Sequence, residues 1–244
     1  MKTPEYKELL DAGVHFGHLK SKWNPKMRPY IFMERKGIHI IDLNRTAEKL
    51  EDAANAARQI AKSGKKVMFV ATKKQARDIV ANAARSVNMP FVTDRWLGGM
   101  MTNFATIRRS VKKMQNIERM LSDGSLSNVT KKERLTLTRE KDKLEKVLGG
   151  VANLNRLPSA LFIVDIHHEH LALQEAQRLG IRTIAMVDTN SDPNSVDYAI
   201  PANDDASKSI ALITNTITEA IKEGLNDRKN MAEEKTSAEA ETEA

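Results

Sequence analysis

Three short runs of consecutive apolar residues restrict the possible folds of this chain more than any other feature. They are Val67–Ala71 (VMFVA), Leu161–Asp165 (LFIVD) and Thr183–Asp188 (TIAMVD). Apolar side chains occupy both faces of each run. Such strands are buried on both faces, as in a parallel sheet that helices cover on both sides.

Helical patterns alternate with these and other candidate strands. Further strands are expected at Ile38–Ile41, Phe91–Thr93 and Tyr198–Ile200. Amphipathic helices are expected at Arg45–Ser63, Lys74–Asn88, Glu169–Leu179 and Asp205–Glu223. The alternation predicts an α/β fold with a doubly wound parallel sheet, a three-layer sandwich joined by right-handed crossovers.

The region 102–148 interrupts this alternation with two long, charged helical patterns and no strand. Its apolar residues follow the spacing of a narrow seam: Ile107, Val111, Met114 and Leu121, then Leu137, Leu144 and Leu148. A turn at Ser122–Ser125 joins the two patterns, and glycine pairs at 98–99 and 149–150 bracket the region. We expect an inserted antiparallel coiled-coil hairpin. Its twelve Lys and Arg against six Asp and Glu fit a solvated surface, or alternatively a basic arm that reaches a second site.

The predicted organisation has three parts. Residues 1–101 and 149–225 form a discontinuous globular domain with a basic N-terminal segment, and residues 102–148 form the hairpin. Residues 226–244 lose the apolar periodicity and end in AEEKTSAEAETEA, so we expect a disordered acidic tail.

Charge is distributed unevenly along the chain. The net charge is +7, and residues 233–244 contribute −4, which leaves +11 on the rest. A body this basic attracts polyanions. The chain has no cysteine, no apolar leader and no apolar run long enough to span a bilayer. We therefore expect a soluble protein of the reducing cytoplasm, without a membrane partner.

The segment Ala12–Phe32 (AGVHFGHLKSKWNPKMRPYIF) is the strongest indication of function. Two prolines should keep its basic part out of a helix, which leaves an irregular, stiff strip. Its cations and flat rings suit a phosphate backbone with unpaired bases, and it offers no nucleophile beside a base. RNA binding is the first hypothesis. The expected phosphate ligands are Lys20, Lys22, Lys26 and Arg28, and the rings expected against a base or sugar are Trp23 and His18.

Two further groups of cations are candidate phosphate ligands. Lys73 and Lys74 follow an expected strand and open a helix, where phosphate docks in doubly wound folds. A helix start with incidental lysines is equally plausible, and no glycine fingerprint of a nucleotide site is present. The second group is Arg95, Arg108 and Arg109. Beside it, Trp96 could stack on a base, although we favour a role in anchoring the hairpin to the core.

Acidic residues at strand ends suggest a metal site. Asp188 ends one strand, Asp204 and Asp205 follow the next, and His18 could meet them at the same sheet edge. This set would accept a structural Zn²⁺ or Mg²⁺ ion, although no cofactor is required, and Asp205 is also suited to cap a helix. A second histidine cluster, His167, His168 and His170, lacks metal-ligand spacing and fits a polar helix start better. We find no catalytic motif.

Six sequence segments, which occur in the same order as in the family, make the chain closely resemble the bacterial ribosomal protein S2 family of the small subunit. They are Ala12–Arg28, Phe69–Lys73, Arg95–Asn103, Leu157–Gly180, Val187–Pro193 and Ile200–Asp205. The resemblance implies a flavodoxin-like α/β sandwich with an inserted coiled-coil hairpin. It also implies a structural, non-catalytic constituent of the small ribosomal subunit, bound to small-subunit rRNA near the head–body junction. Implied protein partners are other small-subunit proteins, including ribosomal protein S1, which the family helps to recruit.

Two other classes of function stay open. A nucleotide- or sugar-phosphate-binding enzyme would use Lys73, Lys74 and the acidic strand edge, but the missing glycine fingerprint argues against it. An adaptor without RNA would act through the hairpin alone, and the basic N-terminal segment argues against that. We expect no small-molecule substrate.

Overall fold

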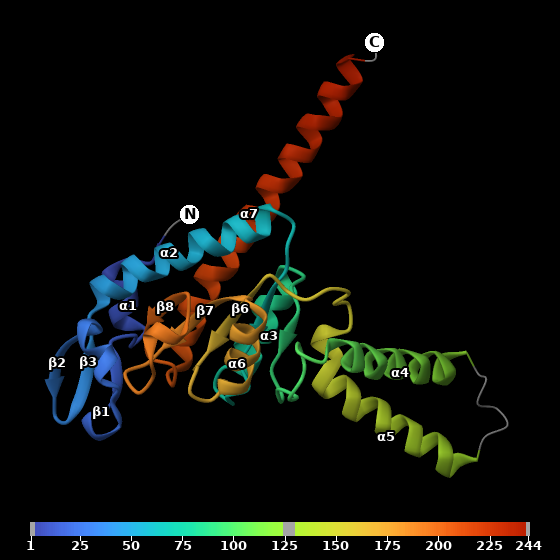
Figure 1. Ribbon diagram of the computed structural model, residues 1–244, viewed down its shortest axis with the longest axis horizontal. Helices are drawn as coiled ribbons and strands as arrows, with labels where there is room; N and C mark the ends of the chain where they lie inside the picture. Colours follow the sequence, from blue (N-terminus) through green and yellow to red (C-terminus); the bar gives the residue numbers. More distant parts are fainter. Residues whose placement is uncertain (1–2, 124–129, 243–244) are drawn as a thin grey trace.

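The structure is a computed structural model that describes residues 3–123 and 130–242. Figure 1 shows a central body built on a parallel sheet, with a small N-terminal sheet at one end. Two helices project from the other end, and the C-terminal helix extends beyond the body in a third direction.

Five parallel strands form the main sheet, in the order β5-β4-β6-β7-β8. Their bounds are β4 Val67–Val70, β5 Phe91–Val92, β6 Ala160–Val164, β7 Arg182–Val187 and β8 Tyr198–Pro201. Every residue of β4 and β6 is buried, which confirms the two-sided burial predicted from their composition. The winding direction reverses between β4 and β6, the switch point at which doubly wound sheets place their sites.

Helices cover both faces of this sheet, so the predicted doubly wound, flavodoxin-like α/β fold is confirmed. One face is covered by α2 (Leu43–Lys62), α3 (Arg77–Ser86) and α7 (Ser207–Thr242). The other is covered by α6 (His170–Leu179) and by the base of the projecting helix pair. The predicted helix at residues 74–88 begins three residues later than expected, because residues 73–76 form a turn.

The packing of α2 against α7 depends on small residues. Ala54 and Ala57 of α2 are fully buried in the same cluster as Ile217 of α7. A Cβ atom at Gly224 would collide with the carbonyl oxygen of Arg58, so glycine permits this close approach of the two helices.

The N-terminal part forms a second sheet that the sequence analysis missed. Helix α1 (Tyr6–Asp11) leads into strands β1 (Phe16–Leu19), β2 (Ile31–Arg35) and β3 (Ile38–Ile41). These strands pair antiparallel in the order β1-β3-β2. The expected strand at residues 38–41 is therefore present, but it belongs to this sheet and not to the parallel one.

The chain between β1 and β2 is more regular than predicted. It forms two short 3-10 helices, Lys20–Lys22 and Pro25–Tyr30. The prolines do exclude an α-helix, but Pro25 takes the first position of a 3-10 helix, where no amide hydrogen is needed. The side chain of Asn24 caps this helix by accepting a hydrogen bond from the Lys26 amide at 3.0 Å.

The two projecting helices are α4 (Phe104–Ser122) and α5 (Lys131–Leu148), which contact each other and spread apart away from the body (Figure 1). Helix α4 buries Ile107, Val111, Met114 and Ile117, whereas α5 buries only Leu148. Both predicted helices are present. A coiled-coil geometry for the pair stays a prediction, and residues 124–125 of the predicted turn lie outside the described residues.

Helix α7 continues through residues 226–242, where we expected disorder. This segment is rich in Ala, Glu and Lys, which have high helix propensity. Ion pairs from Arg58 to Glu223 and Asp227 tie the helix to α2. The last two residues of the predicted tail lie outside the described residues, and the three-part domain division stays a prediction.

Candidate RNA-binding surface and its polar cluster

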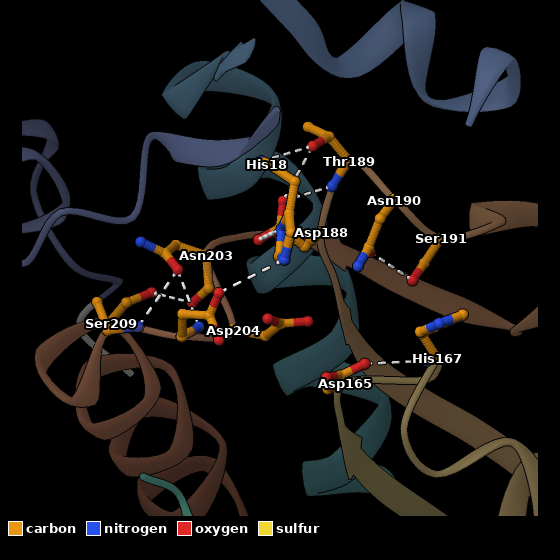
Figure 2. Close-up of polar contacts among 12 residues, drawn as sticks. His18, Asp165, His167, Asp188, Thr189, Asn190, Ser191, Asn203, Asp204 and Ser209 are labelled. Atoms are coloured by element: carbon orange, nitrogen blue, oxygen red, sulfur yellow. Dashed lines mark hydrogen bonds and ion pairs between the residues drawn. The ribbon is translucent and has the colours of Figure 1, made fainter. Parts of the chain in front are cut away.

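Four loops bring charged side chains together at the carboxyl ends of the parallel strands. Lys73 follows β4, Asp165 follows β6, Asp188 follows β7 and Asp204 follows β8, and His18 arrives from β1 of the N-terminal sheet. Figure 2 shows the histidine and the carboxylates converging from these separate elements. We call His18, Lys73, Asp165, Asp188, Asp204 and Asp205 the polar cluster.

Lys73 is the cation at the centre of the polar cluster. Its Nζ lies 2.8 Å from Asp204 Oδ1, 2.6 Å from Asp205 Oδ1 and 3.2 Å from Asp165 Oδ2. Burial acts to lower the pKa of Lys73, but the carboxylates of Asp204, Asp205 and Asp165 outweigh it and raise the pKa above its ordinary value. Because these ion pairs occupy the ammonium group, the structure argues against the predicted phosphate contact by Lys73.

Two carboxylates of the polar cluster are buried and incompletely paired. Asp188 and Asp204 are 1% and 0% exposed. Asp188 Oδ1 accepts hydrogen bonds from the amide and hydroxyl of Thr189 at 2.5 and 3.2 Å. Asp204 Oδ2 receives no hydrogen bond from the described residues, and Asp188 Oδ2 faces His18 alone. Burial, followed by the charges of Asp165 and Asp188, raises the pKa of Asp204 to about 7 despite the proximity of Lys73.

His18 faces this pair of carboxylates. Its Nδ1 lies 2.9 Å from Asp188 Oδ2, an ion pair when the imidazole is protonated, and its Nε2 lies 3.4 Å from Asp205 Oδ2. The hydrogen bond to Asp188 raises the pKa of His18 despite partial burial. The side chain therefore points into the polar cluster, which argues against the predicted contact of His18 with a base or sugar.

Backbone contacts hold β1 against the end of β7. The His18 amide donates to Thr189 Oγ1 at 2.9 Å. A Cβ atom at Gly17 would collide with the Thr189 side chain, so glycine is needed for this approach. Of the four predicted metal ligands, His18, Asp188 and Asp204 bring ligand atoms within 4.8 Å of one another, whereas Asp205 stays at the rim, half exposed.

The other predicted features of this edge are helix-start interactions. Asp165 Oδ1 accepts from the amides of His167 and His168, both at 3.0 Å. These histidines are exposed, as is His170, and the structure supports the polar helix start and not a histidine metal site. Just before α7, Asn203 Oδ1 accepts from the amides of Asp205 and Ala206 at 2.9 and 3.3 Å, so Asn203 forms the turn that leads into this helix.

The basic N-terminal residues divide into paired and free cations. Lys20 pairs with Glu34 at 2.8 Å, and Lys26 pairs with Asp192 at 2.6 Å. Lys22 and Arg28 are exposed, and neither has an ion pair within the described part of the chain. The Lys26–Asp192 pair also joins the second 3-10 helix to the loop after β7, so this helix sits beside the carboxyl edge of the parallel sheet.

Trp23 packs within the protein and not outward. Its ring stacks on that of His39, with centroids 5.2 Å apart and planes 20° apart, and it is half-buried. This arrangement leaves only part of the indole accessible for the predicted contact with a base.

The remaining predicted phosphate ligands lie after β4 and β5 and on α4. Lys74, Arg95 and Arg109 are exposed, and none of them has an ion pair among residues 3–123 and 130–242. Arg108 is half-buried and donates to the Leu154 carbonyl at 2.9 Å. Among the predicted ligands, the exposed cations without an ion pair in the described residues are therefore Lys22, Arg28, Lys74, Arg95 and Arg109. Lys74 and Arg95 follow the carboxyl ends of β4 and β5, whereas Arg109 lies on the projecting helix α4.

Comparison with known proteins identifies the family. Residues 9–224 match the family described as "Ribosomal protein S2". A small ribosomal subunit protein uS2 of Cytophaga hutchinsonii is 60% identical over 228 residues, 93% of this chain and 90% of the relative. The protein of the same name from Flavobacterium johnsoniae is 59% identical over 242 residues, 97% of this chain and 95% of the relative.

The chain belongs to the ribosomal protein S2 family. As a member of this family it is a structural constituent of the small ribosomal subunit and not an enzyme. The enzyme hypothesis is therefore wrong. Within the described residues, no helix combines the length and apolar character needed to cross a membrane.

Two features of this S2-family chain escaped the sequence analysis. The first is Glu175, a buried carboxylate on α6. It accepts hydrogen bonds from Trp96 Nε1 at 3.0 Å and from the amides of Gly99, Met101 and Thr102 at 2.7, 2.9 and 2.9 Å. Burial acts to raise the pKa of Glu175, but these hydrogen bonds together outweigh it and lower the pKa. Trp96 is thus a structural anchor, the role favoured from the sequence. The sequence feature that could have indicated Glu175 is a single acidic residue on the helix face that carries Ala172 and Ala176.

The second missed feature is a basic cavity at the opposite, amino edge of the parallel sheet. It has a volume of about 840 Å³ and is lined by the loops that lead into β4, β5 and β6. Its charged lining residues are Lys65, Lys66, Arg85 and Arg156, with no carboxylate among them. This cavity could not be predicted from the sequence, because its cations lie in three separate segments.

Proposed function

We propose that this chain binds small-subunit rRNA through phosphate contacts at the carboxyl edge of its parallel sheet. The observation that carries the proposal is a set of exposed cations that have no ion pair within the described residues: Lys22, Arg28, Lys74, Arg95 and, on α4, Arg109. A protein surface that leaves cations uncompensated attracts a polyanion, and phosphate contacts supply much of the affinity for RNA.

The positions of these cations suit a fixed docking surface. They lie on separate segments: the N-terminal unit, the turn after β4 and the segment from β5 into α4. Each segment is held by a polar contact, namely that of Asp192 with Lys26 at the surface, of Glu169 with Thr72, which is partly buried, and of Glu175 with Trp96, which is buried. Phosphate contacts made from a rigid frame fix orientation and register without reading sequence.

The basic cavity supports a second phosphate contact at the opposite edge. Lys66 Nζ already donates to the Asn88 carbonyl at 2.7 Å, and the Arg85 guanidinium lies 5.0 Å from the centre of the Phe91 ring. Lys65 and Arg156 have no ion pair within the described residues. Two basic edges on opposite sides of one sheet fit a protein that lies between two rRNA segments, as docking at the head–body junction would require.

We further propose that the protein acts on the ribosome in the cytoplasm and recruits ribosomal protein S1 there. Exposed apolar side chains on the N-terminal sheet support it: Phe32 is 71% exposed, Leu19 52%, Met33 49% and Phe16 48%. Exposed apolar side chains on one sheet are more typical of a protein-binding surface than of an RNA-binding one.

The test of rRNA binding compares two charge-matched variants of the full chain. Filter binding to purified small-subunit rRNA is measured over a range of salt concentrations. The K22Q/R28Q variant should reduce the log–log salt slope by about 1.4–1.8, because each phosphate contact contributes about 0.7–0.9. The K222Q/K229Q variant removes the same charge from exposed sites on α7 and should bind as the parent does. Equal slopes for the two variants would contradict the proposal.

A further inference from the structure

The basic cavity at the amino edge of the parallel sheet has the size and the lining of a ligand site. Its volume of about 840 Å³ lies within the range of about 300–1,000 Å³ that is usual for ligand pockets. Its lining comes from residues 64–66 before β4, residues 85–91 from the end of α3 into β5, and residues 149–159 between α5 and β6. Cations, apolar side chains and side-chain amides are combined there.

The positive charge of the cavity exceeds what the fold requires. The carboxyl-terminal ends of α2, α3 and α5 lie at this edge, and each carries about half a negative charge. The four lining cations more than offset these ends, and no carboxylate lines the cavity. None of the four has an ion pair in the part of the chain that the structure describes. A concave site with this charge attracts phosphate groups.

Arg85 supplies a flat group for a base. Its guanidinium lies 5.0 Å from the centre of the Phe91 ring, in a cation–π contact. Phe91 is itself packed closely against Gly150, where a Cβ atom would collide with the ring and the carbonyl oxygen of Phe91. The guanidinium thus rests on a fixed support. Arginine planes of this kind stack on the unpaired bases of RNA.

Three asparagines add groups that suit the edge of a base. Asn88, Asn153 and Asn155 line the cavity, and all three are exposed. Their side chains make no hydrogen bond to any of the described residues. A side-chain amide offers a donor beside an acceptor, which matches the paired donors and acceptors of base edges. The cavity therefore has partners for a base as well as for a phosphate.

The orientation of the surrounding helices favours a nucleotide of an RNA strand over a free polyphosphate nucleotide. Sites for free nucleotides place the phosphates on amides at a helix N-terminus. Here α2, α3 and α5 instead present their carboxyl-terminal ends. Side-chain cations on exposed segments have to hold the phosphates, as they do along the backbone of single-stranded RNA.

We propose that this cavity binds one unstacked nucleotide of small-subunit rRNA, with its base against Arg85 and its phosphates on Lys65 and Arg156. The proposal rests on the proposed rRNA binding and adds a base pocket, which phosphate contacts alone do not require. The pocket also adjoins the projecting helices, because Arg108 of α4 donates to the carbonyl of Leu154 in the cavity lining at 2.9 Å. A bound nucleotide therefore braces the base of α4.

The first test measures whether the cavity recognises a base. The four nucleoside 5′-monophosphates and ribose 5-phosphate, which lacks a base, are titrated separately into the full chain, and NMR follows the amide chemical shifts. Residues 64–66, 85–91 and 149–159 should shift. At least one nucleotide should bind about 5-fold or more tightly than ribose 5-phosphate, because stacking stabilises the base. Equal affinities, or shifts only elsewhere, would overturn the proposal.

Matched variants separate recognition of the base from attraction of the phosphate. R85K keeps the charge and removes the flat guanidinium, so it should abolish the preference for a nucleotide and still bind ribose 5-phosphate. K65Q/R156Q should weaken the binding of both compounds. R178K, the same change at an exposed arginine on α6, should behave as the parent does. The amide spectrum shows that each variant is folded, and an unchanged preference in folded R85K would contradict the assigned role of Arg85.

A cross-linking experiment tests whether the nucleotide belongs to rRNA. The full chain bound to purified small-subunit rRNA is irradiated with ultraviolet light, digested and analysed by mass spectrometry for nucleotides attached to peptides. The cavity peptides of the parent should carry a nucleotide, and R85K should reduce this product. Bound rRNA without cavity cross-links would overturn the nucleotide pocket and leave the proposed function intact. Loss of rRNA binding by the parent in the filter assay is the separate result that contradicts the proposed function.

Discussion

Glu175 Oε1 lies 3.0 Å from the indole Nε1 of Trp96, which joins α6 to the segment that leads into α4. The same carboxylate also receives three backbone amides from residues 99–102. A single buried side chain thus accepts hydrogen bonds from backbone amides at the base of the projecting helices that would otherwise have no partner. This connection sets the direction of α4 and the position of Arg95 on the carboxyl edge.

Replacing Glu175 by glutamine should destabilise the chain by about 2–3 kcal/mol, because an amide NH₂ would face backbone donors and the charge-assisted hydrogen bonds would be lost. Urea denaturation measures the change. The control is E219Q, an exposed glutamate on α7, which should change the free energy of unfolding by less than about 0.5 kcal/mol. Equal stability of the E175Q and E219Q proteins would show that the carboxylate does not organise the segment.

The contribution of Glu175 should also depend on pH. Its pKa in the folded chain lies below the ordinary value of 4.5, so the folded state binds its proton less readily than the unfolded state does. The stabilisation is therefore complete above the ordinary value and is lost as the pH falls through the lowered pKa. The difference in stability between the parent and E175Q should shrink on acidification. A difference that stays constant or grows at low pH contradicts this account.

Lys73 and Lys74 should have opposite roles, although they are neighbours. K73Q leaves Asp165 and Asp204 buried without a cation, and we expect a loss of about 3–5 kcal/mol in stability. K74Q removes an exposed cation and should leave stability unchanged while it weakens rRNA binding and its salt dependence. Denaturation and filter binding on both variants decide the question. A reversed pattern would restore Lys73 as a phosphate ligand.

The basic cavity should contribute to rRNA binding independently of the carboxyl edge. K65Q/R156Q should reduce the salt slope by about 1.4–1.8, and its effect should add to that of K22Q/R28Q because the two pairs lie at opposite edges of the sheet. The charge-matched comparison is again K222Q/K229Q. Unchanged rRNA binding by K65Q/R156Q would limit the RNA-binding surface to the carboxyl edge.

The parallel sheet could be predicted from the sequence because the composition of its strands shows that they are buried on both faces. Val67–Val70 and Ala160–Val164 are apolar at every position, a pattern that parallel strands between helices share. The N-terminal sheet was missed because its strands are short and its burial follows tertiary contacts. In β2, for example, Ile31 is half-buried, and the four residues that follow it are exposed.

The candidate site was predicted in part for a related reason. Asp188 and Asp204 could be placed at one sheet edge because the carboxyl ends of parallel strands meet there. The pairing of Lys73 with three carboxylates could not be foreseen, because it depends on how the loops after β4, β6 and β8 fold back. Sequence order likewise gave no indication that Trp23 would stack on His39.

The most direct test of the central claim is sedimentation of the tagged full chain from cell lysate. The parent and the K222Q/K229Q protein should co-sediment with small ribosomal subunits at low salt, and high salt or nuclease should release them. A variant that combines K22Q, R28Q, K74Q and R95Q should appear mainly in the free fractions at the same expression level. If that variant sediments with small subunits as completely as the parent, the free cations of the carboxyl edge do not bind rRNA.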